Sequence, residues 1–253
     1  MLNLIDFNGK CILIAGGAKG IGRETGILLS KLGAKVVLMD LKKSDLLDAI
    51  ACMEGENHLY YEYDLNNLEG IQNLMKEIVS ISGPFDGFVH CVGVRSRRPL
   101  SLTTPAVISQ ILNVNFISFV EIIRNISKKN NFNEGLSIIG ISSISSQIGH
   151  KSVTAYAASK AAMDSAVRCL AKELGSKKIR LNTVVPSTIN THVYKEFISS
   201  IDDTDKNNEF PARQHLGLGE PIDVANTIAF LLSKSSRFIT GSAIPVDGGF
   251  LSS

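Results

Sequence analysis

This sequence has few cysteines, no tryptophan and a small net charge. The 253 residues include no tryptophan and four cysteines, which form no C-x-x-C pair and no histidine-rich cluster. This arrangement argues against a zinc module or a disulfide framework, so we expect no metal site and reduced thiols. Two of the cysteines, Cys11 and Cys91, lie in apolar runs that are typical of buried strands.

The charge balance is even, with 26 Lys and Arg against 24 Asp and Glu. It gives no reason to expect a nucleic-acid partner, and the only tight basic cluster is Arg95, Arg97 and Arg98. No apolar run approaches the ~18 residues of a membrane span. The N-terminus carries Asp6 and no apolar stretch before a cleavage site. We therefore expect a cytoplasmic protein without a membrane partner.

Short apolar runs alternate with longer segments of helical period along the whole chain. This pattern predicts a parallel sheet covered on both faces, as in a single doubly wound, Rossmann-like α/β domain over residues 1–253. The polar stretch 190–213, which contains DDTDKNNE, is predicted to be an insertion or lid. The predicted strands are 11–15, 36–39, 58–63, 88–92, 136–141, 179–185 and 243–246, and the predicted helices are 21–32, 71–79, 107–127, a segment beginning near Tyr156, and 224–232.

The turn after the first predicted strand is rich in glycine. Gly16, Gly20 and Gly22 lie between that strand and its helix, where glycine allows backbone N–H groups to approach a pyrophosphate. Asp40 ends the second predicted strand, roughly 20 residues further on, at the spacing of a carboxylate that binds ribose hydroxyls. We favour that role over a simple helix cap.

The segment from Ser143 to Lys160 carries the chemistry. Tyr156 and Lys160 are four residues apart in an Ala-rich run, so on a helix they share one face. A free tyrosine titrates near pH ~10, and a nearby ammonium should lower that pKa, which makes Tyr156 a candidate general acid and base. Ser143 ends the apolar run 136–141 together with Ser142, which should bring its hydroxyl near the tyrosine. The alternative is a plain helix start with one exposed lysine.

Taken in order, these motifs resemble those of the short-chain dehydrogenase/reductase family, nearly from end to end. The matching segments are the glycine turn, HCVG (90–93), NVNF (113–116), ISS (141–143), YAASK (156–160), PSTINT (186–191), GEP (219–221), ITG (239–241) and VDGG (246–249).

The resemblance implies a nicotinamide-dependent oxidoreductase that interconverts a ketone and a secondary alcohol, with Asn115, Ser143, Tyr156 and Lys160 as the catalytic set. Tyr156 would exchange the proton and Lys160 would lower the pKa of Tyr156, while Asn115 would hold a water linked to Lys160. Substrate contacts are expected from Ser143, Ser145 and Tyr156. Cofactor contacts are expected from Gly16, Lys19, Gly20, Ile21, Gly22, Asp40, Leu41, Asp64, Leu65, Cys91, Gly93, Tyr156, Lys160, Pro186, Ile189 and Thr191.

Four positions depart from the family pattern. Ala15 replaces the usual threonine, His90 and Val92 replace residues of the family's NNAG segment, and Ser187 replaces a glycine. None belongs to the catalytic set, and we assign His90 no chemical role because a lone histidine is more often a hydrogen-bonded structural residue.

The sequence specifies the cofactor and the substrate less closely than the catalytic residues. Asp40 should repel a 2′-phosphate and favours NAD over NADP, whereas Lys19 before Gly20 resembles the basic residue of some NADP-dependent members. We expect a small-molecule or carrier-bound substrate, a 3-oxoacyl thioester first, with a sugar, steroid or polyol as the alternative. An arginine of the 94–100 loop could meet an anionic substrate group, or the loop could be simply exposed.

Two further expectations concern the protein as a whole. The resemblance implies a homotetramer or homodimer that pairs the helices following Asn115 and Tyr156. A non-catalytic, regulatory nucleotide-binding relative is the alternative of another class, and it would be marked by loss of Tyr156 or Lys160, both of which are present.

Overall fold

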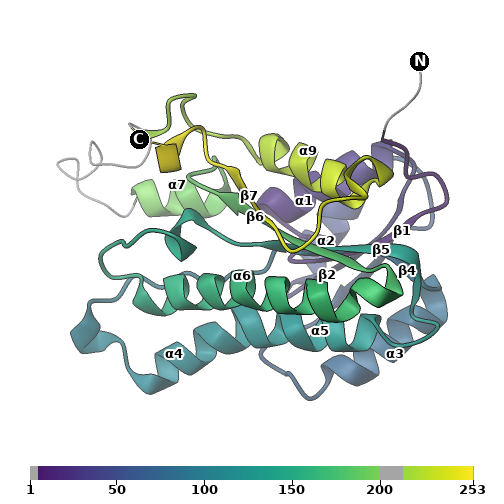
Figure 1. Ribbon diagram of the computed structural model, residues 1–253, viewed down its shortest axis with the longest axis horizontal. Helices are drawn as coiled ribbons and strands as arrows, with labels where there is room; N and C mark the ends of the chain where they lie inside the picture. Colours follow the sequence, from purple (N-terminus) through teal and green to yellow (C-terminus); the bar gives the residue numbers. More distant parts are fainter. Residues whose placement is uncertain (1–4, 200–212, 253) are drawn as a thin grey trace.

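The computed structural model describes residues 5–199 and 213–252, and a seven-stranded parallel sheet forms the centre of this part of the chain (Figure 1). The strand order is β3-β2-β1-β4-β5-β6-β7. The strands are β1 (Cys11–Ala15), β2 (Lys35–Asp40), β3 (Leu59–Glu62), β4 (Phe85–His90), β5 (Phe132–Ile141), β6 (Arg180–Pro186) and β7 (Ala243–Val246).

The strands are continuously apolar because both faces of the sheet are covered. All five residues of β1 are buried, and successive side chains point to opposite faces. Leu13 and Phe88 therefore belong to one layer of the core, and Ile12 and Ile14 to the other. The predicted doubly wound α/β fold is confirmed.

Helices cover each face of the sheet (Figure 1). The core on one face is completed by α1 (Gly20–Lys31), α2 (Lys43–Ile50) and α9 (Pro221–Leu232). The core on the other is completed by α3 (Ile71–Ser82), α5 (Ser118–Ile126) and α6 (Thr154–Leu174). The helix α2 was not predicted: its eight residues bury only Leu46 and Ala49, too short an apolar stripe to be recognised.

The single helix predicted over 107–127 is wrong in one respect. The structure has α4 (Pro105–Leu112), a π-helical turn (Asn113–Ile117) and then α5. The combined run Pro105–Ile126 is long and apolar enough to cross a membrane by length and composition, contrary to our expectation. Part of this run, including Phe119 and Ile122, packs into the core against the sheet.

The segment 190–213 is described only in part. It contains α7 (His192–Ser199), and residues 200–212 of the predicted lid lie outside the described residues. The first residues of α7 line the pocket described below, as expected for a segment that borders a site.

The strand order places a crevice at the carboxyl edge of the sheet. The chain moves outward from β1 to β3 and then returns to β4 on the other side of β1. In open α/β sheets, ligands bind at such a switch point, outside the carboxyl ends of the strands. The segments that follow β1, β4, β5 and β6 all meet there.

Candidate active site

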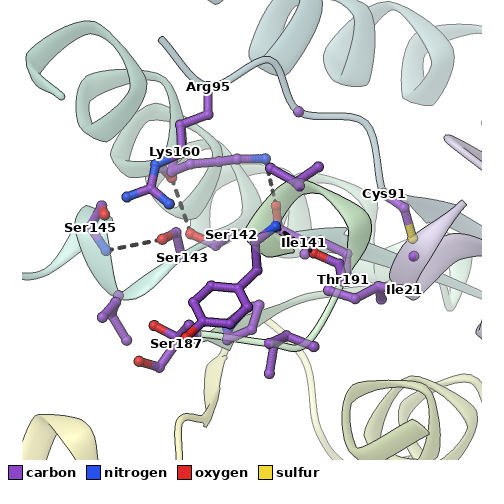
Figure 2. Close-up of a pocket in the computed structure, with 18 of the residues that line it drawn as sticks. Ile21, Cys91, Arg95, Ile141, Ser142, Ser143, Ser145, Lys160, Ser187 and Thr191 are labelled. Carbon is purple, nitrogen blue, oxygen red and sulfur yellow. Dashed lines mark hydrogen bonds between the residues drawn. The ribbon is translucent and has the colours of Figure 1, made fainter. Parts of the chain in front are cut away.

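A pocket of about 220 Å³ opens at this switch point (Figure 2). It is formed by the glycine turn, the loop after β4, the segment after β5, the first turns of α6 and the segment after β6. Its lining residues are Lys19, Gly20, Ile21, Gly22, Cys91, Gly93, Arg95, Ile141, Ser142, Ser143, Ile144, Ser145, Tyr156, Lys160, Pro186, Ser187, Thr188, Ile189, Thr191, His192, Val193 and Tyr194.

The glycine turn is compact because the backbones of Gly16 and Gly22 are in contact. Gly16 has a φ of +77°, and its N–H donates to the Met39 carbonyl at 2.8 Å. A Cβ placed on Gly22 would lie 2.0 Å from the Gly16 carbonyl oxygen. Backbone can therefore approach a ligand here as closely as a pyrophosphate requires, and the first turn of α1 carries no acidic residue to oppose one. These residues fit a dinucleotide.

Asp40 lies at the end of β2, as predicted, directly under the glycine turn. One carboxylate oxygen accepts the Ala18 N–H at 2.9 Å, and the other accepts the Leu41 N–H at 2.7 Å. Leu41 is exposed, the Asp64 carboxylate accepts hydrogen bonds from Asn66, and the Leu65 side chain belongs to the core. None of these four predicted cofactor residues lines the pocket itself.

Lys19 lines the pocket, but its charge is already paired. Its Nζ lies 2.8 Å from an Asp45 carboxylate oxygen on α2, an interaction that raises the pKa of Lys19. The sequence suggested that Lys19 could attract a 2′-phosphate. Because the unpredicted helix α2 supplies a carboxylate partner, that attraction is weakened in the folded protein.

Ser143, Tyr156 and Lys160 all line the pocket, as predicted from their spacing, and Figure 2 shows Ser143 and Lys160 within it. Ser143 follows the end of β5, and its hydroxyl acts on Tyr156 in the direction that lowers the pKa of that residue. The Ser143 hydroxyl also accepts the Ser145 N–H at 3.2 Å, which holds it in place. Lys160 is buried, with Nζ 5.9 Å from the centre of the Tyr156 ring.

The expected lowering of the Tyr156 pKa by Lys160 is wrong for this structure. Burial raises the pKa of Tyr156, opposed by the hydrogen bond with Ser143 and by the charge of Arg95. Lys160 Nζ instead donates to the Ile141 carbonyl at 2.7 Å and to the Val92 carbonyl at 3.4 Å. Burial also lowers the pKa of Lys160 to about 8, which leaves it protonated at neutral pH.

Asn115 lies in the π-helical turn and is fully buried. Its Oδ1 accepts the Val94 N–H at 2.7 Å, and its Nδ2 donates to the Val94 carbonyl at 3.0 Å and to the Ser159 hydroxyl at 2.9 Å. Both amide hydrogens are used within the protein, so the side chain connects the loop after β4 to α6. The predicted water would have to donate to an Asn115 oxygen, and this role stays a prediction.

His90 is a buried structural residue, in agreement with the sequence interpretation. Its Nε2 lies 3.1 Å from the Ser118 hydroxyl, which donates to the Val114 carbonyl at 2.7 Å. The Ser118 N–H donates to the Asn113 carbonyl, five residues back, as in a π-helix. The Val114 carbonyl, four residues back, would accept that N–H in an α-helix, and here it accepts the Ser118 hydroxyl instead. Burial lowers the pKa of His90 to about 3, which keeps the ring neutral beside Lys160.

The wall after β6 contains the predicted Pro186, Ile189 and Thr191, but it is shaped by a residue that the sequence did not reveal. Gln214 is buried, and its Oε1 accepts the Ser187 hydroxyl at 3.1 Å and the Thr188 N–H at 3.0 Å. A glutamine in a polar segment belongs to no motif, so only the folded chain identifies it. Arg95, likewise one of three equivalent arginines in the sequence, is the one that lines the pocket.

The structure pairs none of the four cysteines with another, and their reduced state stays a prediction. All four lie in the described part of the chain, and all are free. Cys91 follows β4 and does not belong to the strand itself, and burial raises the pKa of its thiol to about 12. It contacts the pocket as a neutral side chain.

The chain is similar to known proteins over almost its whole length. The family described as enoyl-(acyl carrier protein) reductase matches residues 16–251. The chain is 30% identical to L-xylulose reductase of Caenorhabditis elegans over 97% of both chains, and 33% identical to L-rhamnose-1-dehydrogenase of Scheffersomyces stipitis over 96% of both. A solved short-chain dehydrogenase/reductase described as glucose/ribitol dehydrogenase, from Brucella melitensis, superposes with a TM-score of 0.89 at 27% identity, covering 97% of this chain and 98% of that one.

Proposed function

Because the chain belongs to the short-chain dehydrogenase/reductase family and is an oxidoreductase that acts on CH–OH and C=O groups, we propose that it interconverts a small polyhydroxylated ketone or aldehyde and its alcohol. The observation that carries the proposal is the convergence of Ser143, Tyr156 and Lys160 in one pocket at the switch point. The presence of all three also argues against a non-catalytic regulatory relative.

Each residue of the pocket has a distinct task in this proposal. Ser143 hydrogen-bonds the substrate oxygen, and Tyr156 donates its proton to that oxygen in reduction or accepts it in oxidation. Lys160 binds the ribose next to the nicotinamide, while the glycine turn and the start of α1 bind the diphosphate. Asn115 positions the loop after β4 against α6. Nicotinamide dinucleotide, when bound, supplies or accepts the hydride.

The substrate class follows from the lining of the pocket. Hydroxyl-bearing residues line the pocket, among them Ser143, Ser145, Ser187 and Tyr194, together with Arg95. Such donors and acceptors pair with the hydroxyl groups of a short sugar or polyol. The similarity to proteins named for L-xylulose and L-rhamnose supports this class, and it favours the sugar alternative over the 3-oxoacyl thioester that the sequence suggested first.

A substrate screen tests the proposal directly. The purified protein would be assayed with NADH and NADPH against ketoses, aldoses, polyols, hydroxysteroids and a 3-oxoacyl thioester. Turnover of short sugars or polyols with the highest kcat/KM is expected. Preference for the thioester would restore the first sequence interpretation, and binding of nucleotide without turnover of any compound would support the non-catalytic alternative.

We propose NAD as the preferred cofactor, on the basis of Asp40 and of the pairing between Lys19 and Asp45. Asp40→Ser should raise affinity for NADPH relative to NADH by roughly 10-fold, because it removes a carboxylate that repels the 2′-phosphate. Fluorescence titration of both nucleotides measures this ratio. Asp48→Asn, an exposed acid on α2, is the matched control. Tighter NADPH than NADH binding by the wild type would contradict the assignment.

We also propose that the protein is a homodimer or homotetramer, as the family resemblance implies. The helical run Pro105–Ile126 is strongly apolar, yet only 39% of its most apolar window is buried within the chain. Ile117 is exposed in its π-helical turn. Light scattering coupled to size-exclusion chromatography should give two or four times the 27.3 kDa of the chain. A monomer mass at micromolar concentration would refute the proposal.

A further inference from the structure

Ser187 brings a hydroxyl to the pocket at a position where the family pattern has a glycine. It follows Pro186, the last residue of β6, and it lines the pocket. Figure 2 shows Ser187 apart from Cys91 and from Ile21 of the glycine turn. Because the dinucleotide phosphates are assigned to the glycine turn, this hydroxyl lies away from them.

The Ser187 hydroxyl is bound on one side by Gln214, which is 4% exposed. The Gln214 Oε1 lies 3.1 Å from the Ser187 hydroxyl oxygen and 3.0 Å from the Thr188 backbone nitrogen. The Gln214 Nε2 lies 3.2 Å from the Thr188 carbonyl oxygen and 2.8 Å from that of Gly217. These four contacts use all the donors and acceptors of the amide.

The contacts also fix which end of the Gln214 amide is the oxygen. Two carbonyl oxygens lie at one end, and a carbonyl can only accept, so the NH₂ group must be there. The Thr188 N–H lies at the other end, which must therefore be the oxygen. The Ser187 hydroxyl next to that oxygen donates its single proton to it.

Backbone contacts hold Ser187 and Gln214 in place. The Gly217 N–H donates to the Gln214 carbonyl at 2.9 Å, and the Ser187 N–H donates to the Val246 carbonyl at 3.4 Å. A Cβ placed on Gly248 would lie 3.3 Å from the Gln214 Cβ, so Gln214 is packed closely against the turn after β7. A pair that is already ordered loses little conformational freedom when it meets a ligand.

The donated proton determines what Ser187 offers to a ligand. A serine hydroxyl has one proton and two lone pairs, and here the proton is used by Gln214. No group among the described residues donates to the Ser187 oxygen in turn. The oxygen therefore presents only lone pairs to the pocket, and a ligand group that binds it must carry a proton.

We propose that Ser187 accepts a hydrogen bond from a hydroxyl group of the substrate, and that Gln214 is the positioning residue that sets this polarity. The proposal rests on the proposed function and adds a requirement to it. The sugar or polyol must carry a free hydroxyl at one defined position besides the reacting carbon. The N–H groups of the nicotinamide carboxamide are the competing donor, and the test separates the two.

The test uses fluorine as a replacement for a hydroxyl that cannot donate. The best sugar or polyol of the substrate screen is compared with its monodeoxyfluoro analogues, one for each hydroxyl that does not react. The ratio of kcat/KM for the parent to that for the analogue is measured for wild type, Ser187→Ala and Gln214→Met. The readout is the wild-type ratio divided by the variant's ratio, a quotient in which the electronic effect of fluorine cancels.

We expect Ser187→Ala to give a quotient of roughly 3 to 10 at one position and about one at the others, the effect of one neutral hydrogen bond. Gln214→Met keeps the Ser187 hydroxyl but frees its proton to turn toward fluorine, so its quotient should exceed one at the same position. A purely structural role of Gln214 would change kcat/KM equally for parent and analogues, which leaves the quotient at one. If Gln214→Met does not fold, Ser187→Ala decides alone.

The matched control removes a hydroxyl outside the pocket. Ser80 is an exposed residue of α3 that does not line the pocket, so Ser80→Ala should give a quotient of one at every position. A quotient near one throughout for Ser187→Ala would overturn the proposal. If that variant also bound NADH several-fold more weakly, the donor would be the nucleotide and not the substrate.

Failure of this proposal differs from failure of the proposed function. Good turnover of sugars or polyols with a quotient of one would leave the proposed oxidoreductase in place. Failure of every sugar and polyol, with turnover of steroids or thioesters, would refute the proposed function and this proposal with it.

Discussion

Tyr156→Phe is expected to reduce kcat by about 10²- to 10⁴-fold, the range typical of a lost general acid or base. The change removes one hydroxyl and keeps the ring against which Arg95 and Lys160 lie. The pocket wall and the glycine turn are unchanged, so NADH should still bind. Steady-state kinetics and fluorescence titration of NADH measure the two effects separately.

The control for this variant makes the same chemical change elsewhere. Tyr61→Phe removes a hydroxyl from β3, outside the pocket, and should keep wild-type kcat. Activity of Tyr156→Phe within a few-fold of the wild type would show that the proton comes from another group. If Tyr156→Phe lost both NADH binding and activity, the substitution would have disrupted the pocket itself.

The same residue predicts opposite pH profiles for the two directions of the reaction. Burial raises the pKa of Tyr156, so the hydroxyl is protonated at neutral pH. Reduction of a carbonyl needs that proton and should slow as pH rises through the pKa of Tyr156. Oxidation of an alcohol needs the phenolate and should quicken over the same range. Initial rates in both directions, measured across pH, test this inverse pair.

Gly22→Ala should abolish nucleotide binding, with an affinity loss of roughly 100-fold or more. The new Cβ would lie 2.0 Å from the Gly16 oxygen and 3.2 Å from the Cys91 Cβ. Gly16 cannot retreat easily, because its N–H is bonded to Met39 and its φ is positive. Overpacking of this kind costs about 1–3 kcal/mol, or roughly 2–12 °C in Tm for a chain of this size.

Thermal unfolding and NADH titration together test the Gly22 variant. Gly175→Ala is the matched control: its Cβ would meet nothing within 4 Å, and the residue has helical backbone angles. That variant should keep both Tm and affinity. Wild-type affinity in Gly22→Ala would mean that the dinucleotide does not approach this turn.

The elements that could be predicted are those whose signal is local. The strands 11–15 and 243–246 agree with β1 and β7 in both bounds, since each is a short apolar run between polar or glycine residues. Ser143, Tyr156 and Lys160 were found because a strand end and a helical spacing of four bring them together. The π-helical turn at Asn115 was not predicted, because its apolar residues continue the pattern of the helices on either side and no local signal marks the change.

The amino-acid sequence was sufficient to predict the fold class, the glycine turn and the three side chains, Ser143, Tyr156 and Lys160, that meet in the pocket. Each of these depends mainly on residues close together in the chain. Only the tertiary structure determined the pKa shifts and the charge pairing in the site. Burial, and not Lys160, dominates the pKa of Tyr156, and Asp45 of a short unpredicted helix pairs with Lys19. It also singled out Arg95 from three neighbouring arginines. The reason is physical: burial and charge pairing depend on which distant segments are brought into contact, and no local pattern specifies those contacts.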